Sequence, residues 1–203
     1  FELSQQIGKF IVTVAKRIQE DEMDIQKWIE SSFLCDNIVA KTIIDYVREQ
    51  LLFLNEVPSD KTLLVESFMD PQNRLNIVFH AYFGRRVNDA LSRAYAYAIG
   101  KQIQSDVASA VNDNGFLLIL PSGKMFDTEK IPELVTLENL EKLLKEAIRN
   151  TELFQTRFRH VANRSLMILR NSGKRPIPVS RQNLYARRIL DSIKTQDDFC
   201  VVK

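Results

Sequence analysis

The sequence predicts an α+β fold in which helical groups pack with antiparallel β-hairpins. Three observations predict this class. Helical spacing of apolar residues fills the first 57 residues, two pairs of strand-like segments follow around turn-forming residues, and helical spacing returns after residue 136. Because helices and hairpins come in groups rather than alternating one by one, the order favours α+β over α/β. We divide the chain into an N-terminal helical group, residues 1–57, and an α+β domain, residues 58–203.

The N-terminal group should contain three helices. Apolar residues recur at helical spacing over Leu3–Ile18, a shorter helix fits Asp24–Phe33, and Asp36 is a good N-cap for a helix that runs through Leu51. Helices followed by strands are typical of the end of a winged-helix unit, and they are equally typical of the helical wall of one domain. Both interpretations stay open.

Two hairpins should follow this group. Thr62–Phe68 and Leu75–Tyr82 flank the turn residues Asp70–Asn73, while Val107–Val111 and Phe116–Leu120 flank Asn112–Gly115. Asn, Asp and Gly favour such turns because they tolerate positive φ. Between the hairpins we expect a helix that ends at Gly100 as its C-cap.

The C-terminal part should be mainly helical. We expect a loop, then two helices, an irregular segment with Gly173, Pro176 and Pro178, and a last helix that Ser180 caps. The corresponding ranges are 121–132 for the loop, Thr136–Asn150 and Glu152–Arg170 for the helices, 171–179 for the irregular segment, and Ser180 to about Lys194 for the last helix.

Composition indicates an ordinary folded protein, with 45% hydrophobic and 27% charged residues. No apolar run reaches the roughly 18–20 residues of a membrane span and no signal peptide is visible, so we expect a cytoplasmic protein without a membrane partner. Cys35 and Cys200 lie far apart without metal-like spacing and should be free thiols. Because the chain begins with Phe1 rather than Met, we expect it to be part of a longer protein.

No catalytic or cofactor motif is recognisable. Ser122-Gly123-Lys124 and Ser172-Gly173-Lys174 resemble the end of a phosphate-binding loop, but both lack its upstream glycine and its magnesium-binding Ser or Thr. His80 follows apolar strand residues and is expected to be partly buried. Trp28 is more typical of a core than of a base-stacking platform. We therefore expect no catalytic residue, cofactor or metal in this chain.

A basic block at the C-terminal end is the clearest functional signal. Residues 157–190 contain nine bases and no Asp or Glu, so the remaining 19 of the 28 bases stand against all 26 acidic residues. Such clustering is typical of a surface that binds polyanions. The nine bases are Arg157, Arg159, Arg164, Arg170, Lys174, Arg175, Arg181, Arg187 and Arg188.

Helical spacing arranges part of this block. Arg157, His160 and Arg164 fall on one face of the predicted helix, and Ser180 could offer a helix N-terminus to a phosphate. The opposite face would bury Phe154, Phe158, Val161, Ala162 and Leu169.

A second candidate contact is Gly84-Arg85-Arg86-Val87-Asn88, where a strand passes into a helix. Each candidate contact has a structural alternative. The C-terminal block could be a solvated basic surface that pairs with acidic neighbours elsewhere in the fold. At the second site, the glycine could serve a sharp turn while the arginines extend into solvent.

The same segments resemble the DEAD/H-associated region of the large helicase-related (Lhr) family of superfamily 2 helicases. The resemblance is carried by residues 83–88, by Val111-Asn112-Asp113-Asn114-Gly115-Phe116 with Leu120-Pro121, by residues 157–166, and by Arg175-Pro176 and Arg181-Gln182. It implies a region that follows two RecA-like motor domains and a winged helix and helps to enclose a translocating strand. The longer protein would be an ATP-dependent, 3′-to-5′ translocating helicase, with ATP and magnesium bound only in the absent motor domains.

We therefore expect an accessory nucleic-acid-binding domain without enzymatic activity of its own. Its partners would be single-stranded DNA or a DNA:RNA hybrid and the RecA-like motor domains of the same chain. The expected contacts are Arg85, Arg86, Asn88, Arg157, Arg159, His160, Arg164, Arg170, Lys174, Arg175, Arg181 and Arg188. One alternative is a scaffolding domain that docks on the motor domains, and another is a nuclease or glycosylase with an unrecognised carboxylate.

Overall fold

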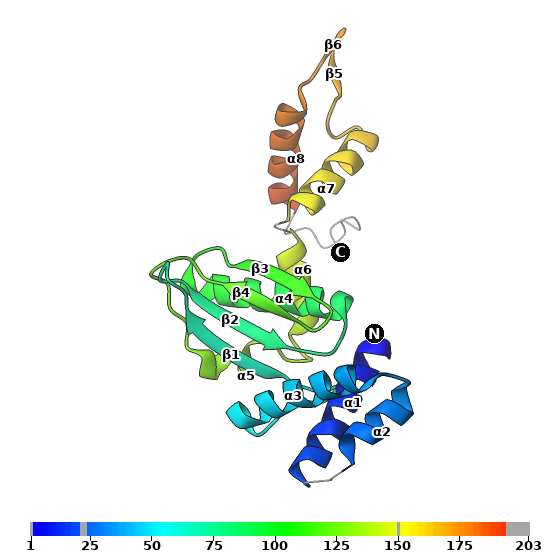
Figure 1. Ribbon diagram of the computed structural model, residues 1–203. Helices are drawn as coiled ribbons and strands as arrows, with labels where there is room; N and C mark the ends of the chain where they lie inside the picture. The colour runs from blue at the N-terminus through cyan, green and yellow to red at the C-terminus, as the bar shows by residue number, and fades with distance from the viewer. Residues whose placement is uncertain (1, 21–23, 150, 194–203) are drawn as a thin grey trace. The chain divides into compact units, whose positions relative to one another are not determined.

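The computed structural model describes residues 2–20, 24–149 and 151–193 and confirms the α+β class. The chain forms two compact units, an N-terminal unit of residues 1–140 and a C-terminal unit of residues 141–203. Figure 1 shows the helices and strands of each unit, and each unit is described by itself below. Of the two cysteines, Cys35 is a free thiol, and Cys200 lies outside the described residues.

Three helices open the N-terminal unit, as predicted: α1 (Glu2–Gln19), α2 (Ile25–Phe33) and α3 (Asn37–Leu54). The Asp36 side chain caps α3 by accepting a hydrogen bond of 2.8 Å from the amide of Val39. Val14, Ile29 and Val47 are buried where the three helices meet, and Tyr82 from beyond the second strand packs into the same core. The helical group and the following domain therefore share buried surface.

Helix α1 also approaches a turn of the backbone closely. A Cβ atom on Gly8 would lie 2.8 Å from the amide nitrogen of Asp60. The turn itself is held by the Ser59 hydroxyl, which accepts hydrogen bonds from the amides of Lys61 and Thr62. The missing side chain at Gly8 is what allows the helix to pack against this turn.

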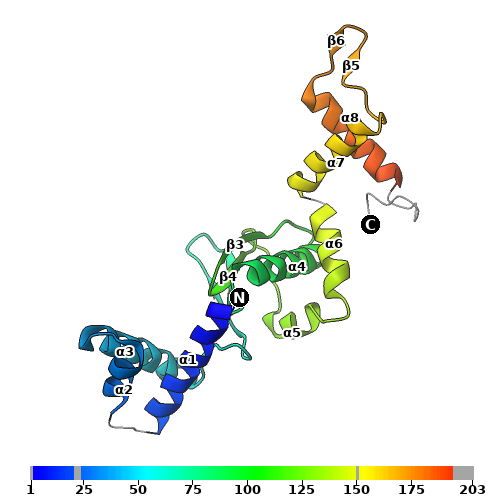
Figure 2. The ribbon, with the colours of Figure 1, turned by 90° about the vertical axis from the view of Figure 1, so that its right-hand side faces the viewer.

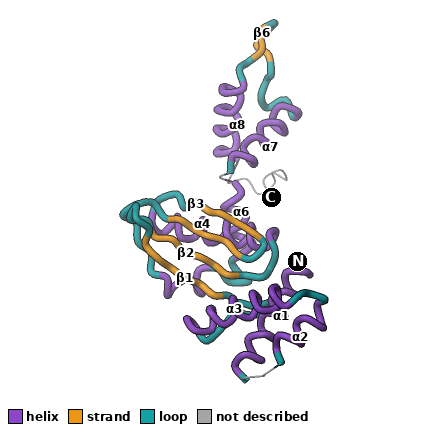
Figure 3. Tube along the Cα trace, viewed as in Figure 1, coloured by secondary structure: helices purple, strands orange, loops and turns teal. Residues whose placement is uncertain are grey.

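Both predicted hairpins form, and they join into one antiparallel sheet of order β1-β2-β4-β3 (Figure 3). The strands are β1 (Leu64–Met69), β2 (Leu75–His80), β3 (Ala108–Asn112) and β4 (Gly115–Ile119). The pairing of β2 with β4 places His80 opposite Gly115. A Cβ atom on Gly115 would lie 2.0 Å from the carbonyl oxygen of Phe79, so this register requires a glycine.

Helix α4 (Arg85–Ile103) covers one face of this sheet, as Figures 1 and 2 both show. Ile77, Phe79, Phe116 and Leu118 project from β2 and β4 into a core with Ile99 of the helix. The rings of Phe79 and Phe116 stack with centroids 4.2 Å apart. The alternate residues of the strands form the opposite face of the sheet.

The predicted C-cap of α4 is wrong. The helix continues through Gly100 to Ile103, and Gln104 adopts the left-handed conformation with φ of 52°. Gly100 instead gives space to the returning chain, because a Cβ atom there would lie 2.9 Å from the carbonyl oxygen of Ser105. A glycine near a helix end can therefore serve packing rather than capping.

From residue 121 to residue 149 the chain is more regular than predicted. The expected loop contains η1 (Thr128–Lys130) and the start of α5 (Ile131–Leu134). Helix α6 (Leu140–Arg149) begins four residues later than predicted, because Thr136 and Asn139 hydrogen-bond to each other's amides and form a turn. The predicted helix end, Asn150, lies outside the described residues.

The C-terminal unit contains α7 (Glu152–Arg164), a hairpin of β5 (Asn171–Ser172) and β6 (Arg175–Pro176), and α8 (Val179–Ile193). Its helices were predicted, but α7 ends at Arg164 rather than Arg170. Leu166 takes a φ of 59°, and the amide of Ile168 then bonds to the carbonyl of Ala162. This reversal buries Ile168 and leaves Leu169 61% exposed, opposite to our prediction for Leu169.

The segment predicted to be irregular forms the β5–β6 hairpin. Ser172 pairs with Arg175, so Gly173 and Lys174 make a two-residue turn in which Gly173 has a φ of 62°. The last helix also differs at its ends: Ser180 lies inside its first turn rather than before it, and the predicted end Lys194 lies outside the described residues.

Candidate nucleic-acid interface

The C-terminal unit is held together by the facing sides of α7 and α8. Phe158 and Ala162 of α7 pack with Ala186 and Leu190 of α8, and all four side chains are buried. The two helices are further joined by a hydrogen bond of 2.9 Å from Arg187 Nη2 to Gln155 Oε1. Because apolar residues occupy the facing sides, the basic residues must project elsewhere.

Most of the nine bases of the block are exposed to solvent. Eight are exposed, and only Arg159 is half-buried. Within the part of the chain that the structure describes, none of the nine forms an ion pair with a carboxylate, whereas surface bases of other segments do, such as Arg93 with Asp89 at 2.9 Å. Unpaired guanidinium groups keep their full attraction for phosphate.

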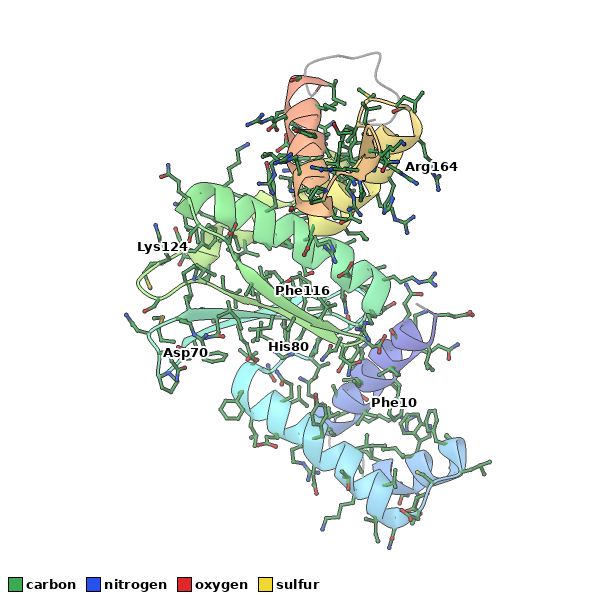
Figure 4. The ribbon with its side chains drawn as sticks, turned by 90° about the horizontal axis from the view of Figure 1, so that it is seen from above. Phe10, Asp70, His80, Phe116, Lys124 and Arg164 are labelled. Carbon is green, nitrogen blue, oxygen red and sulfur yellow. The ribbon has the colours of Figure 1, made fainter. Side chains whose placement is uncertain are left out.

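The bases are distributed over several faces rather than gathered in one trough. Arg157 and Arg164 are seven residues apart on the side of α7 away from its buried residues, with His160 beside them. Figure 4 shows Arg164 at the edge of this unit. Arg181 and Arg188 are likewise seven residues apart on the outer side of α8.

The remaining expected contacts lie on the hairpin and at the edge of α7. Lys174 and Arg175 are exposed on the β5–β6 hairpin, and Arg170 is exposed directly before it. Arg159 lies on another side of α7 from Arg157, where its Nη2 is 3.2 Å from His160 Nε2 and its buried Nε has no partner. The structure thus brings together pairs of bases, one pair on each helix.

A polar groove that the sequence did not indicate runs along α7 and α8. It has a volume of about 550 Å³, and its lining includes Gln155, Thr156, Ser180, Asn183 and Arg187. Arg187 was the one base of the block without an assigned role. Spacing could have indicated it, since Ser180, Asn183 and Arg187 follow one another on one side of α8. Glu152 also lines the groove and opposes the charge of Arg187.

The junction at Gly84 differs from the predicted phosphate site. Arg85 and Arg86 are exposed, but the amide of Arg85 already bonds to Asp113 Oδ1 at 3.3 Å. The Asn88 side chain is fully buried. Its Nδ2 donates to the carbonyls of Ala81, Asn112 and Asp113 at 3.0–3.2 Å. Asn88 therefore fastens the β3–β4 turn to α4, and its prediction as a nucleic-acid contact is wrong.

His80 and Trp28 both contact neighbouring side chains of the fold. His80 is half-buried in β2 with its Nε2 3.3 Å from Glu66 Oε1. Trp28 packs edge-on against Phe33, and the Arg17 guanidinium lies 4.1 Å from its ring centroid. This agrees with a packing role for Trp28.

Neither Ser-Gly-Lys tripeptide forms a phosphate-binding loop. Lys124 donates to the carbonyl of Ile103 at 3.0 Å, and Gly173-Lys174 forms the hairpin turn, so neither tripeptide opens a helix. No three His, Cys, Asp or Glu residues in the described ranges are grouped as metal ligands. Among the described helices none has the length and apolarity to span a membrane.

Comparison with known proteins gives consistent matches. The family described as DEAD/H associated matches residues 57–203. The ATP-dependent helicase Lhr-Core protein 2 of Thermococcus barophilus is 39% identical over 100% of this chain and 23% of its own length. The ATP-dependent helicase Lhr-Core of Methanothermobacter thermautotrophicus is 40% identical over 98% of this chain and 23% of its own length. This chain thus spans about a quarter of the length of these two curated relatives.

A solved structure supports the same fold. The structure of Mycobacterium smegmatis helicase Lhr bound to ssDNA and AMP-PNP matches with a TM-score of 0.64 at 24% identity. The match covers 99% of this chain and 25% of that chain.

Proposed function

Because this chain belongs to the DEAD/H-associated family, we propose that it is an accessory domain of an Lhr-type helicase and binds the backbone of single-stranded DNA. The observation that carries the proposal is the set of nine bases in the C-terminal unit, eight of them exposed and none ion-paired within the described ranges. Polyanion binding depends on such local charge rather than on the net charge of +2.

Pairs of bases on different faces suit a flexible strand better than a rigid duplex. A single strand can bend around the C-terminal unit and meet Arg157 with Arg164 on one helix and Arg181 with Arg188 on the other. Contacts to phosphate carry no sequence information, so binding should be independent of sequence. The same chemistry would accept the exposed single-stranded part of a DNA:RNA hybrid.

ATP hydrolysis belongs, in this proposal, to motor domains elsewhere in the longer protein. Those RecA-like domains would bind ATP and magnesium, and this chain would contribute the path of the strand. We therefore expect the chain alone neither to hydrolyse ATP nor to unwind a duplex. Incubation with labelled strands followed by a denaturing gel should also leave the strands intact, since a cleaved product would indicate a nuclease.

Fluorescence anisotropy with a labelled oligonucleotide tests the proposal. Affinity should fall steeply between about 50 and 200 mM salt, with a slope of about 0.7 per neutralised phosphate in a plot of log affinity against log salt. Oligonucleotides of different sequence and equal length should bind alike. Affinity that does not change with salt would contradict phosphate binding by the basic block.

A second role is favoured by a separate surface, the outer side of α3. Ile38, Tyr46, Leu52 and Phe53 are 60–82% exposed on the side of α3 opposite its buried residues. Exposed apolar side chains of this size are typical of a protein contact, and here they share the outer side of α3 with Asp45 and Glu49. This surface would dock on other domains of the longer helicase. A pull-down with the separately produced motor domains tests it, and Phe53→Glu should abolish the association without changing nucleic-acid affinity.

A further inference from the structure

An apolar pocket lies in the C-terminal unit where the chain leaves the β5–β6 hairpin and α8 passes beside it. Its volume is about 360 Å³, at the lower end of the range for small-ligand sites. The walls include Met167, Leu169, Ile177 and Tyr185, and Arg188 contributes to the lining. Leu169 is 61% exposed and Tyr185 and Met167 are each 38% exposed, so water contacts an apolar surface here.

The positive charge around this pocket indicates which kind of ligand it can bind. Arg181, Tyr185 and Arg188 stand on one side of α8 at spacings of four and three residues. No Asp or Glu occurs from Arg157 to Leu190, and neither arginine is ion-paired in the described residues. An occupant should therefore have an apolar, flat part for the pocket and negative charges for its rim. A nucleotide within a single strand has both.

Hydrogen bonds fix the wall of this pocket in the unbound chain. Gln182 Nε2 donates to the carbonyl of Ile177 at 2.7 Å, and Gln182 Oε1 accepts from Asn163 Nδ2 at 3.0 Å. The amide of Ile177 bonds to the carbonyl of Arg170 at 2.7 Å. These bonds tie Ile177, which follows β6, to α8 and through Gln182 to α7, so binding needs no large rearrangement.

We infer that this pocket accepts one unstacked base of the bound strand, with the base against Tyr185 and its flanking phosphates at Arg181 and Arg188. The inference rests on the proposed function and adds a base contact to it. Stacking on an aromatic ring tolerates every base, so it remains independent of sequence. Bases of a duplex are already paired and stacked, and the pocket therefore gives the domain a preference for single strands.

A comparison of two oligonucleotides tests the inference on the unaltered chain. One is a labelled thymidine oligonucleotide, and the other has the same length and charge but abasic sites throughout. The thymidine strand should bind at least about fivefold more tightly, which is the lower limit for stacking one base on an aromatic side chain. Both strands should lose affinity with salt in the same way, since their phosphates are equal in number.

Variants of Tyr185 then locate the contact. Tyr185→Ala should lower affinity for the thymidine strand to the abasic level and leave abasic binding unchanged, while Tyr185→Phe should retain the difference. Leu184→Ala is the matched control, because Leu184 is exposed on α8 but lies outside this pocket. If Tyr185→Ala fails to fold, Tyr185→Leu keeps the bulk and removes the flat ring.

The possible results separate the inference from the proposed function. Equal, salt-dependent affinity for the thymidine and abasic strands would overturn the base pocket and leave backbone binding intact. A thymidine preference that survives both Tyr185→Ala and Tyr185→Leu would likewise overturn the base pocket alone. Absence of salt-dependent binding to either strand would overturn the proposed function itself.

Discussion

Asn163 of α7 and Gln182 of α8 are joined by a hydrogen bond of 3.0 Å from Nδ2 to Oε1, and Gln182 passes the connection on to the carbonyl of Ile177. Both residues belong to the segments through which the sequence resembles the Lhr family. The matching residues in these segments therefore include some that stabilise the fold. The Asn163–Gln182 pair holds α7, α8 and Ile177 in the pocket wall in place relative to one another.

Replacing either member of this pair should destabilise the C-terminal unit. Asn163 is 8% exposed, so Asn163→Ala leaves Gln182 without its buried donor and should cost about 1–3 kcal/mol in the free energy of unfolding. Denaturant unfolding followed by circular dichroism measures the loss. Asn183→Ala, at an exposed position of the same helix, should change stability by less than about 0.5 kcal/mol. Equal effects of the two substitutions would contradict a structural role for the pair.

Gly115→Ala should destabilise the sheet strongly. The added Cβ atom would lie 2.0 Å from the Phe79 carbonyl oxygen, so β2 and β4 must separate or bend, at a cost of at least about 1–3 kcal/mol. Gly123→Ala is the matched control, because nothing lies within 4 Å of a Cβ atom there and only its φ of 76° is unfavourable, at roughly 1–2 kcal/mol. Thermal unfolding should rank Gly115→Ala as the more harmful change.

Asn88→Ala should reduce stability, whereas Arg86→Ala should not. The Asn88 amide donates to three backbone carbonyls in a buried site, and its loss should cost about 1–3 kcal/mol or more. Arg86 is exposed and its removal should stay within about 0.5 kcal/mol. Anisotropy measured on folded Arg86→Ala would show separately whether this arginine contacts nucleic acid.

Removing pairs of bases should lower the salt dependence of oligonucleotide binding. Arg181→Ala with Arg188→Ala should reduce the slope by about 1.4, which corresponds to two lost phosphate contacts, and should weaken binding to all sequences similarly. Arg157→Ala with Arg164→Ala tests the outer side of α7 in the same way. Arg48→Ala is a control, since Arg48 is paired with Asp45 at 3.5 Å and lies on α3. An unchanged slope in both double variants would remove the basis for backbone binding by these helices.

Strongly alkaline solution should destabilise the N-terminal helical core. Burial of the phenol raises the pKa of Tyr82 to about 12, and its contact with Tyr46 adds to the shift. The folded state then keeps a proton that the unfolded state loses above its pKa of about 10, so stability is retained below pH 10 and falls as the pH rises from about 10 to 12. Unfolding measured against pH should show this fall, and Tyr82→Phe should reduce it.

The sequence determined the local structure well because local structure depends on near neighbours along the chain. Apolar spacing predicted α1 to α3, Asp36 capped its helix as expected, and Asn112–Gly115 formed the turn between β3 and β4. At Arg164 the helix ends because the chain turns back and buries Ile168 in the core with Ala186 and Leu190 of α8, a contact with a distant segment. At Gly100 the helix instead continues to Ile103. Propensity is a weak preference that such tertiary contacts override.

The composition of the basic block was also evident from sequence, but its geometry was decided only by the folded structure. Residues that are adjacent in sequence, such as Arg187 and Arg188, point to different sides of α8, one into the polar groove and the other to the apolar pocket. Asn88 was assigned to the surface although it is buried beneath the β3–β4 turn. The physical reason is that charge depends on residue type alone, whereas exposure and partners depend on which distant segments the chain brings against each side chain.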